Sequence, residues 1–268
     1  MTLAVCATPI GNLDDVTLRV LAELAEADVV LCEDTRHTAR LLDRHGIRAR
    51  ALLSYHRHNE AARQTQVLAR LRAGERVSLV SDAGLPGIND PGVRLVSAAR
   101  DAGMSVTVLP GASAVTTAVV ASGFSAERYQ FLGYLPRGAA ALAALWEELA
   151  AWPHAAVAFE APRRLPASLA SLAGAAPERP VAVCRELTKR FEEVVRGPAG
   201  DIASRFAAEV KGEIVIVLGP VPVVRAPDDD AVAAVAELVE AGVPRRQAAD
   251  IVGRLRGVSA RSLYRRSL

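Results

Sequence analysis

The sequence predicts an α/β protein with two domains, and two observations lead to that prediction. First, 268 residues with a hydrophobic content of 51% suit one large or two modest α/β domains. Second, short apolar runs of β type alternate along most of the chain with segments of helical spacing. The apolar runs lie at residues 3–7, 29–32, 77–81, 106–109, 155–159, 181–185 and 213–218.

The segments between these runs carry apolar residues at the spacing of an α-helix. They lie at residues 17–27, 38–45, 60–73, 91–102, 113–121, 139–151, 164–173 and 202–208. Glycines stand directly after three of them, at Gly46, Gly74 and Gly103, where a helix commonly ends in a left-handed residue. Strand and helix therefore alternate, as in an α/β sheet.

Two stretches divide the chain into three parts. Residues 123–138 are typical of a crossover between two halves, and residues 222–230 are typical of a linker. We therefore expect an N-terminal α/β domain at 1–122, a second α/β domain at 123–222 and a small helical appendix at 223–268.

The appendix combines helical patterning with a concentration of positive charge. Residues 231–241 predict one amphipathic helix, a second begins near Pro244, and a turn and third short helix close the chain. The pattern is reminiscent of a helix-turn-helix, although a plain pair of packed helices explains it nearly as well. Between Pro244 and Leu268 seven arginines face Asp250 alone, a local charge of +6 in a chain of net charge +2. This asymmetry favours contact with a polyanion, while the scarcity of lysine makes arginine the default solubilising residue here.

Several classes of protein are disfavoured. Proline, glycine or charge interrupts every long apolar stretch, and the N-terminus lacks the features of a signal peptide, so we expect a cytoplasmic protein without a membrane span. The three cysteines, Cys6, Cys32 and Cys184, are far apart and lie in apolar runs. We therefore expect buried reduced thiols, with neither a disulfide framework nor a metal site.

Three loops that follow apolar runs combine glycine or proline with small and polar residues. The first contains Pro9 and Gly11, the next runs from Ser81 to Gly92, and the third runs from Pro110 to Thr116. Ligands bind at the carboxyl ends of strands in open α/β sheets, and such loops let backbone approach a ligand closely. In the Ser81–Gly92 loop we expect Asp82 to face a ligand and Asn89-Asp90 to cap the following helix. The motifs of phosphate-binding and dinucleotide-binding loops are absent.

Two further segments are dense in ionisable groups. Residues 33–38 read Glu-Asp-Thr-Arg-His-Thr, and residues 54–60 bring His56 and His58 next to Arg57. A helix start capped by Asp34 or Thr38 would explain only one of these side chains. Such a cluster can hold an anionic backbone and accept a proton near neutral pH. Metal binding by the two histidines lacks a third ligand.

These segments, in this order and near this spacing, resemble the tetrapyrrole-methylase superfamily of S-adenosylmethionine enzymes, and in particular its ribosomal RNA branch. The resemblance rests on T-P-I-G-N-L at 8–13, E-D-T-R-H-T at 33–38, H-N-E at 58–60 and S-D-A-G at 81–84. It extends to residues 159–164, 185–189 and 212–213 and covers almost the whole chain. Leu85 and Arg163 depart from it, since the family has Thr and His there.

The resemblance implies a homodimer in which S-adenosylmethionine binds in the cleft between two α/β domains. It also implies 2′-O-methylation of a cytidine ribose in the decoding region of 16S ribosomal RNA, with that RNA or the small ribosomal subunit as partner. The alternatives are a tetrapyrrole (corrin-type) C-methyltransferase and a noncatalytic RNA-binding factor on the same fold. The basic appendix and the Glu33–Thr38 cluster argue against the tetrapyrrole substrate.

Site residues are carried over from the resemblance position by position. The implied cofactor-binding residues are Pro9, Gly11, Asp82, Ala83, Gly84, Ser113, Ala114, Leu187, Glu213 and Ile214. Candidates for the general base that activates the ribose hydroxyl are Asp34, His37, His56 and Glu160. Candidates for holding RNA phosphates are Arg36, Arg57, Arg163, Arg185, Arg245, Arg246, Arg261 and Arg265. For Glu160 and Arg185, an ion pair between adjacent strands is the alternative interpretation.

Overall fold

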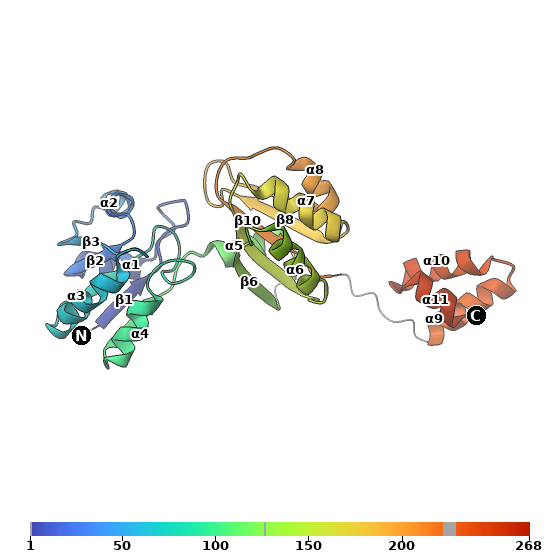
Figure 1. The fold of residues 1–268 in the computed structure, drawn as a ribbon, viewed down its shortest axis with the longest axis horizontal. Coiled ribbons are helices and arrows are strands. Elements are labelled where there is room, and N and C mark those ends of the chain that lie inside the picture. Colours follow the sequence, from blue (N-terminus) through green and yellow to red (C-terminus); the bar gives the residue numbers. More distant parts are fainter. Residues whose placement is uncertain (1, 126, 222–228) are drawn as a thin grey trace. The chain divides into compact units, whose positions relative to one another are not determined.

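The computed structural model describes residues 2–125, 127–221 and 229–268 (Figure 1). The chain forms two compact units, Met1–Pro220 and Val221–Leu268. The larger unit contains two five-stranded sheets with their helices, and the smaller one is helical. The predicted α/β class with a helical C-terminal appendix is confirmed.

The first sheet is entirely parallel. Its strands are β1 (Thr2–Cys6), β2 (Val29–Cys32), β3 (Leu52–Ser54), β4 (Val77–Leu79) and β5 (Ser105–Leu109). They are ordered β3-β2-β4-β1-β5. The strands β1, β2 and β4 are buried along nearly their whole length, as expected for a parallel sheet covered by helices on both faces.

Four helices cover this sheet. On one face, α1 (Leu18–Glu26) and α2 (Thr35–Arg44) pack through Val20, Leu24 and Leu42 against Ala4 and Cys6 of β1. The opposite face is covered by α3 (Glu60–Arg72) and α4 (Val93–Asp101). Both cores consist mostly of aliphatic side chains with almost no exposure, joined on the α3–α4 face by the fully buried Tyr55. Burial of the helix faces against the sheet therefore stabilises this half of the unit.

The second sheet is mixed. Its strands are β6 (Tyr129–Tyr134), β7 (Ala155–Glu160), β8 (Pro180–Arg185), β9 (Glu193–Pro198) and β10 (Ile214–Leu218), ordered β6-β7-β10-β8-β9. Only the β6–β7 pair is parallel; the others are antiparallel. On one face of this sheet lie α6 (Ala139–Ala150), α7 (Leu165–Ala175) and α8 (Ala199–Arg205). Its core runs through Trp146, Leu169 and Ile216.

The other face of the second sheet is covered by α5 (Ala114–Ser122), the helix that directly follows the last strand of the first sheet. Its side chains Val115, Ala118 and Val119 pack against Val157 of β7 and Val217 of β10. The predicted domain boundary at residue 122 stays a prediction, because residues on both sides of it belong to one compact unit.

The C-terminal unit is a three-helix cluster made of α9 (Asp229–Glu240), α10 (Arg245–Arg256) and α11 (Ala260–Arg266). Ala231, Val235, Ala249, Val252 and Leu263 form its own buried core. Gly257 ends α10 in the left-handed conformation and α11 follows after a short turn, so a helix–turn–helix connection is present. The predicted linker at 222–230 lies largely outside the described residues.

The structure corrects two expectations and confirms others. The segment 123–138, predicted as a crossover, contains strand β6, and α4 begins at Val93 with Gly92 as its N-cap, so Asn89-Asp90 do not cap it. Strands β3 and β9 were not predicted at all. All three cysteines are buried and free, as expected. Among the described residues, no helix is both long and apolar enough to cross a membrane.

Candidate functional site

The order of the first sheet creates a topological switch point between β1 and β4. After β1 the chain passes to β2 on one side, and after β4 it passes to β5 on the other side, although β1 and β4 are neighbours. The two loops that leave these strands therefore part from one another at the carboxyl edge of the sheet. Two hydrogen bonds join them there: the Thr8 N–H donates to the Gly84 carbonyl at 2.8 Å, and the Gly84 N–H donates to the Thr8 carbonyl at 3.1 Å.

Backbone conformation in the β4–α4 loop depends on glycine. Gly84 has a φ of +78°, in the left-handed region that a side chain would disfavour. Two residues earlier in this loop, Asp82 accepts a hydrogen bond from the Asp34 N–H at 3.1 Å and so ties the β4 loop to the end of β2. The carboxyl ends of β1, β2 and β4 are thus linked into one platform.

The second sheet reaches this platform through the loop between β8 and β9. The Asn12 N–H donates to the Thr188 hydroxyl at 3.0 Å. A Cβ atom on Gly11 would lie 2.6 Å from Lys189 Cγ and 2.9 Å from the Leu187 carbonyl oxygen, so only glycine permits this approach. Glu186 and Thr188 both adopt positive φ, which stores backbone strain in the loop.

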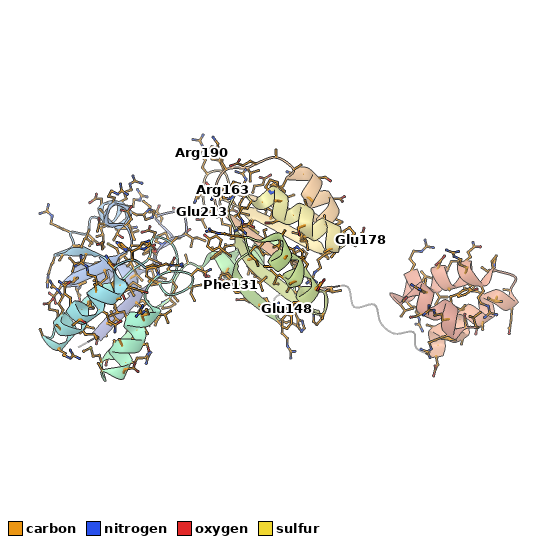
Figure 2. All side chains as sticks on the ribbon, in the orientation of Figure 1. Phe131, Glu148, Arg163, Glu178, Arg190 and Glu213 are labelled. Atoms are coloured by element: carbon orange, nitrogen blue, oxygen red, sulfur yellow. The ribbon has the colours of Figure 1, made fainter. Side chains whose placement is uncertain are left out.

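Lys189 holds the base of this loop together. Its Nζ lies 2.9 Å from Glu186 Oε1 and 2.9 Å from Glu213 Oε2. Figure 2 shows Glu213, Arg163 and Arg190 at the same end of the second sheet, opposite the end that carries Glu148 and Glu178. That end is where β7 and β8 finish and β10 begins.

Between these loops and the second sheet lies a cavity of about 520 Å³. Its apolar wall contains Ile10, Val115, Phe159, Ile214 and Val215. Its polar lining includes Glu33, Arg57, Asn89, Asp90, Ser113, Tyr134, Glu160 and Glu213. An apolar pocket with a few convergent polar groups is the usual form of a small-molecule site.

Two carboxyl groups at this cavity are shifted toward the protonated form. Burial raises the pKa of Asp90 to about 6, assisted by the negative charge of Glu33. The pKa of Glu33 is also raised, by burial and then by the charge of Asp82, while Arg57 and His56 oppose that shift. Perturbed carboxyls in a cavity mark a functional site more often than ordinary surface acids do.

The residues implied as cofactor-binding fall into two groups. Those that line the cavity are Ala83, Gly84, Ser113, Ala114, Glu213 and Ile214. Pro9, Gly11, Asp82 and Leu187 stand outside this lining. The last three belong to the contacts that hold its loops: Gly11 touches the β8–β9 loop, Asp82 binds the end of β2, and buried Leu187 packs with Ile10. Their role in cofactor binding stays a prediction.

Two of the predicted bases are engaged in structural bonds. Buried Glu160 accepts hydrogen bonds from Arg164 Nη2 at 2.9 Å, from the Ala161 N–H at 2.6 Å and from the Ser168 hydroxyl. Asp34 caps α2, accepting from the Arg36 N–H at 2.8 Å and pairing with its guanidinium at 2.7 Å. These bonds hold the pKa of Asp34 well below its usual range. The capped-helix interpretation therefore holds for Asp34.

The two predicted histidines lie outside the cavity lining. His37 is exposed on α2, whereas His56 is half-buried, and its backbone N–H donates to the Asn59 side chain at 2.9 Å. Its Nδ1 is buried without a hydrogen-bond partner. As for the two carboxylates, catalysis by these histidines stays a prediction.

The predicted RNA-binding arginines also differ in setting. Arg57 lines the cavity and donates to the Asn89 carbonyl. Arg163 is exposed, and Arg36 is exposed while paired with Asp34. Arg185 pairs with Glu193 on the adjacent strand at 3.0 Å. An ion pair between adjacent strands is the alternative interpretation for Arg185, and its partner is Glu193 rather than Glu160. In the C-terminal unit Arg246, Arg261 and Arg265 are exposed and Arg245 is half-buried.

Sequence reasoning missed four of the polar residues that line the cavity. Glu33 belongs to a segment that the sequence marked as dense in charge, and Asn89-Asp90 were assigned to a helix cap. Tyr134 lies at the end of the unpredicted strand β6, and its ring meets Phe159 edge-on at 5.5 Å between centroids. The only signal for these residues was their position after a strand, at the edge where ligands bind.

This chain matches one family model and is similar to several known proteins. The family model described as Tetrapyrrole (Corrin/Porphyrin) Methylases matches residues 2–203. A protein named Ribosomal RNA small subunit methyltransferase I from Micromonospora olivasterospora is 43% identical over 267 residues, covering 98% of this chain and 85% of that protein. Its namesake from Mycobacterium bovis is 46% identical over 265 residues, covering 96% and 91%.

A solved structure shares the fold. It is the uroporphyrin-III C-methyltransferase of Thermus thermophilus complexed with S-adenosylhomocysteine. It superposes with a TM-score of 0.56 at 20% identity, covering 81% of this chain and 96% of that one.

Proposed function

Because this chain belongs to the tetrapyrrole methylases, and within them to the family of the small-subunit ribosomal RNA methyltransferases I, we propose that it methylates a ribose 2′-hydroxyl of 16S ribosomal RNA. The enzyme is an S-adenosylmethionine-dependent methyltransferase that acts on ribosomal RNA. The finer proposal is that the target is a cytidine in the decoding region. It rests on the resemblance of the loops at 8–13, 33–38, 58–60 and 81–84.

The cavity fits S-adenosylmethionine in size and chemistry. Its volume of about 520 Å³ lies within the ordinary range of small-molecule pockets. Ile10, Val115 and Ile214 offer an apolar wall for a purine ring. The Asn89 amide Nδ2 is buried with no partner in the protein, so it has a hydrogen bond to give to a bound group. When bound, S-adenosylmethionine supplies a methyl group on a positively charged sulfur.

The observation that carries the proposal is where this cavity lies. It lies at the switch point of the parallel sheet and is closed by the second sheet, so a ligand there meets both halves. Carboxylates and Arg57 gather at its polar side. Positioning two reactants in such a pocket supplies much of the rate enhancement for a displacement reaction.

We also propose that the C-terminal unit binds RNA phosphates. Arg246, Arg261 and Arg265 are exposed on α10 and α11, and a guanidinium suits phosphate geometry. The partner would be 16S ribosomal RNA or the small subunit, and the enzyme would act as a cytoplasmic homodimer. Replacing Arg261 and Arg265 by Gln should lower the slope of log affinity against log salt by about 1 per lost contact, which filter binding at several salt concentrations measures.

The decisive experiment is transfer of labelled methyl from S-adenosylmethionine to small subunits that lack their own 2′-O-methylation, followed by nuclease mapping. We expect label on one cytidine ribose in the decoding region. Ala114→Phe should abolish transfer by filling the cavity, whereas Thr116→Phe, exposed on the same helix, should not. An absence of label on subunits and on naked RNA, with cofactor binding intact, would overturn the RNA assignment.

A further inference from the structure

Methylation of a hydroxyl requires a group that removes its proton, and the cavity limits which group that is. This inference rests on the proposed function, because it concerns the same reaction. Four carboxylates line the cavity: Glu33, Asp90, Glu160 and Glu213. Each can be judged by the bonds that it already makes.

The two carboxylates of the second sheet are committed to cations. Glu160 has its oxygens occupied by Arg164, Ser168 and the Ala161 amide. Glu213 pairs with Lys189 at 2.9 Å. Both carboxylates are therefore already engaged by partners within the protein.

The two carboxylates of the first sheet are in the opposite situation. Glu33 follows β2 and Asp90 lies in the loop after β4, so neighbouring strands deliver them to the same side of the cavity. Within the described chain neither takes part in an ion pair. Both are partly buried, which disfavours two adjacent negative charges.

We propose that Asp90 is the general base that accepts the proton of the attacking hydroxyl, and that Glu33, which the neighbouring strand delivers to the same side of the cavity, acts through Asp90. Asp90 is a catalytic residue in this scheme and Glu33 is a positioning residue. The pair resembles other sites in which two neighbouring carboxyl groups bind a single proton between them.

The surroundings of Asp90 support this assignment. Burial is the main cause that brings its pKa to about 6, close to the range in which a base works best near neutral pH. Glu33 and Asp82 raise this pKa further, while a hydrogen bond with Ser81 and the charge of Arg57 lower it. Across the cavity, burial and then the charges of Glu213, Asp90 and Glu160 raise the pKa of Tyr134, so these groups interact electrostatically through one cavity.

The proposed step balances in charge and atoms. The hydroxyl oxygen loses its proton to the Asp90 carboxylate and uses the freed electron pair to bond the methyl carbon. The carbon–sulfur pair stays on sulfur. A carboxylate and a sulfonium thereby become a neutral acid and a neutral sulfide, and the acid returns its proton to solvent after release.

The test compares Asp90→Asn and Glu33→Gln with wild-type protein in single-turnover methylation of small subunits. Asp90→Asn should lower the rate by roughly 10²- to 10⁴-fold, the usual contribution of a general base. Calorimetry should show binding of S-adenosylmethionine within a few-fold of wild type. Asp101→Asn, at the end of α4 and exposed, is the matched control and should leave both quantities unchanged.

The titration of the two carboxyl groups can also be measured directly, independently of activity. Carbon-13 NMR titration of the free protein should find the Asp90 carboxyl near pH 6, and Glu33→Gln should shift it to lower pH by removing the adjacent charge. The acid limb of the pH–rate profile should move with it, which a purely structural role of Glu33 would not produce. An Asp90→Asn enzyme that keeps a rate within threefold of wild type would overturn the inference. A wild-type enzyme that labels no RNA would instead overturn the proposed function.

Discussion

The two sheets bring carboxylates of different character to one cavity. At the second sheet Glu160 and Glu213 are each bound to a cation, and Glu193 on the edge strand β9 likewise pairs with Arg185. From the first sheet Glu33 and Asp90 carry no ion pair within the described residues, and the pKa of each is raised. The cavity therefore has paired carboxylates on the side of the second sheet and unpaired ones on the side of the first.

This difference separates structural acids from functional ones without reference to sequence motifs. A paired, buried carboxylate costs stability when it is removed, because its partners lose their bonds. An unpaired carboxylate in a cavity already costs stability while it is present, because its charge is poorly solvated. The same chemical substitution should consequently act in opposite directions at the two sheets.

The largest expected effect tests that contrast directly. Glu160→Gln should lower the free energy of unfolding by about 3 kcal/mol, since it leaves the Arg164 guanidinium without its buried partner. Glu33→Gln, the same substitution at an unpaired position, should leave that free energy unchanged or raise it. Urea denaturation at pH 7 measures both. Equal losses at the two positions would remove the distinction between the sheets.

A second prediction tests whether the contact at Gly11 holds the two sheets together. Gly11→Ala places a methyl group within 3 Å of Thr188, Lys189 and the Leu187 carbonyl, and backbone cannot move away as a flexible side chain can. We expect a loss of about 2 kcal/mol, as for other overpacked positions. Thermal unfolding followed by circular dichroism checks it. Gly138→Ala, where nothing lies within 4 Å, is the control.

The third prediction concerns pH. Because the folded pKa of Asp90 is raised from 3.8 to about 6, the folded state holds a proton that the unfolded state releases between these values. The contribution of Asp90 to stability is thus fully present below about pH 4 and is lost as pH rises through 6. Asp90→Asn should be more stable than wild type at pH 7 by about 1 kcal/mol, a value reduced because the half-buried carboxyl is partly solvated.

Urea titrations at pH 4 and pH 7 measure this difference. The gain of the Asn variant should largely disappear at the lower pH, because Asp90 in the folded wild-type protein is then protonated and carries no buried charge. A gain of the same size at both values would mean that packing, and not ionisation, separates the two proteins.

The smallest effect is expected at the surface. Arg36→Ala breaks the pair with Asp34, but the arginine side chain is 86% exposed, so unfolding free energy should fall by no more than about 0.5 kcal/mol. Asp34→Ala also removes the cap of α2 and should cost about 1 kcal/mol. Denaturation of the two variants in parallel distinguishes the contribution of the helix cap to stability from that of the ion pair.

Much of the fold was predictable because it depends on local patterns. Residues 29–32 form β2 as expected, and the predicted strand near 181–185 is β8. The missed strands lack the pattern: β3 has only three residues, β6 contains Gly133 within an aromatic run, and β9 carries Glu193 and Arg196. All three are edge strands, each paired with one neighbour, β2, β7 or β8, and that pairing rather than an apolar pattern of their own fixes their positions.

The site was predictable in location but not in chemistry. Loops after strands could be placed at one edge of the sheet, and Ala83, Gly84, Ser113 and Ala114 of these loops line the cavity, while their role in cofactor binding stays a prediction. Whether a carboxylate is available for catalysis depends on its partners in the folded protein. Glu160 pairs with Arg164, four residues later, and the sequence alone does not distinguish such a paired carboxylate from a catalytic one. Asn89-Asp90 look like a helix cap, yet Asn89 has a φ of +63° and Gly92 is the N-cap of α4.

Helix α5 has a consequence for dividing the chain into fragments. It follows the last strand of one sheet and packs on the other, and Ser113 and Ala114 line the cavity where the chain passes between them. A break placed before residue 113 would leave α5 with the strands that it covers, whereas a break after residue 122 would strip the second sheet of one face. Reassembly of two separately expressed pieces should therefore succeed for the first cut and fail for the second.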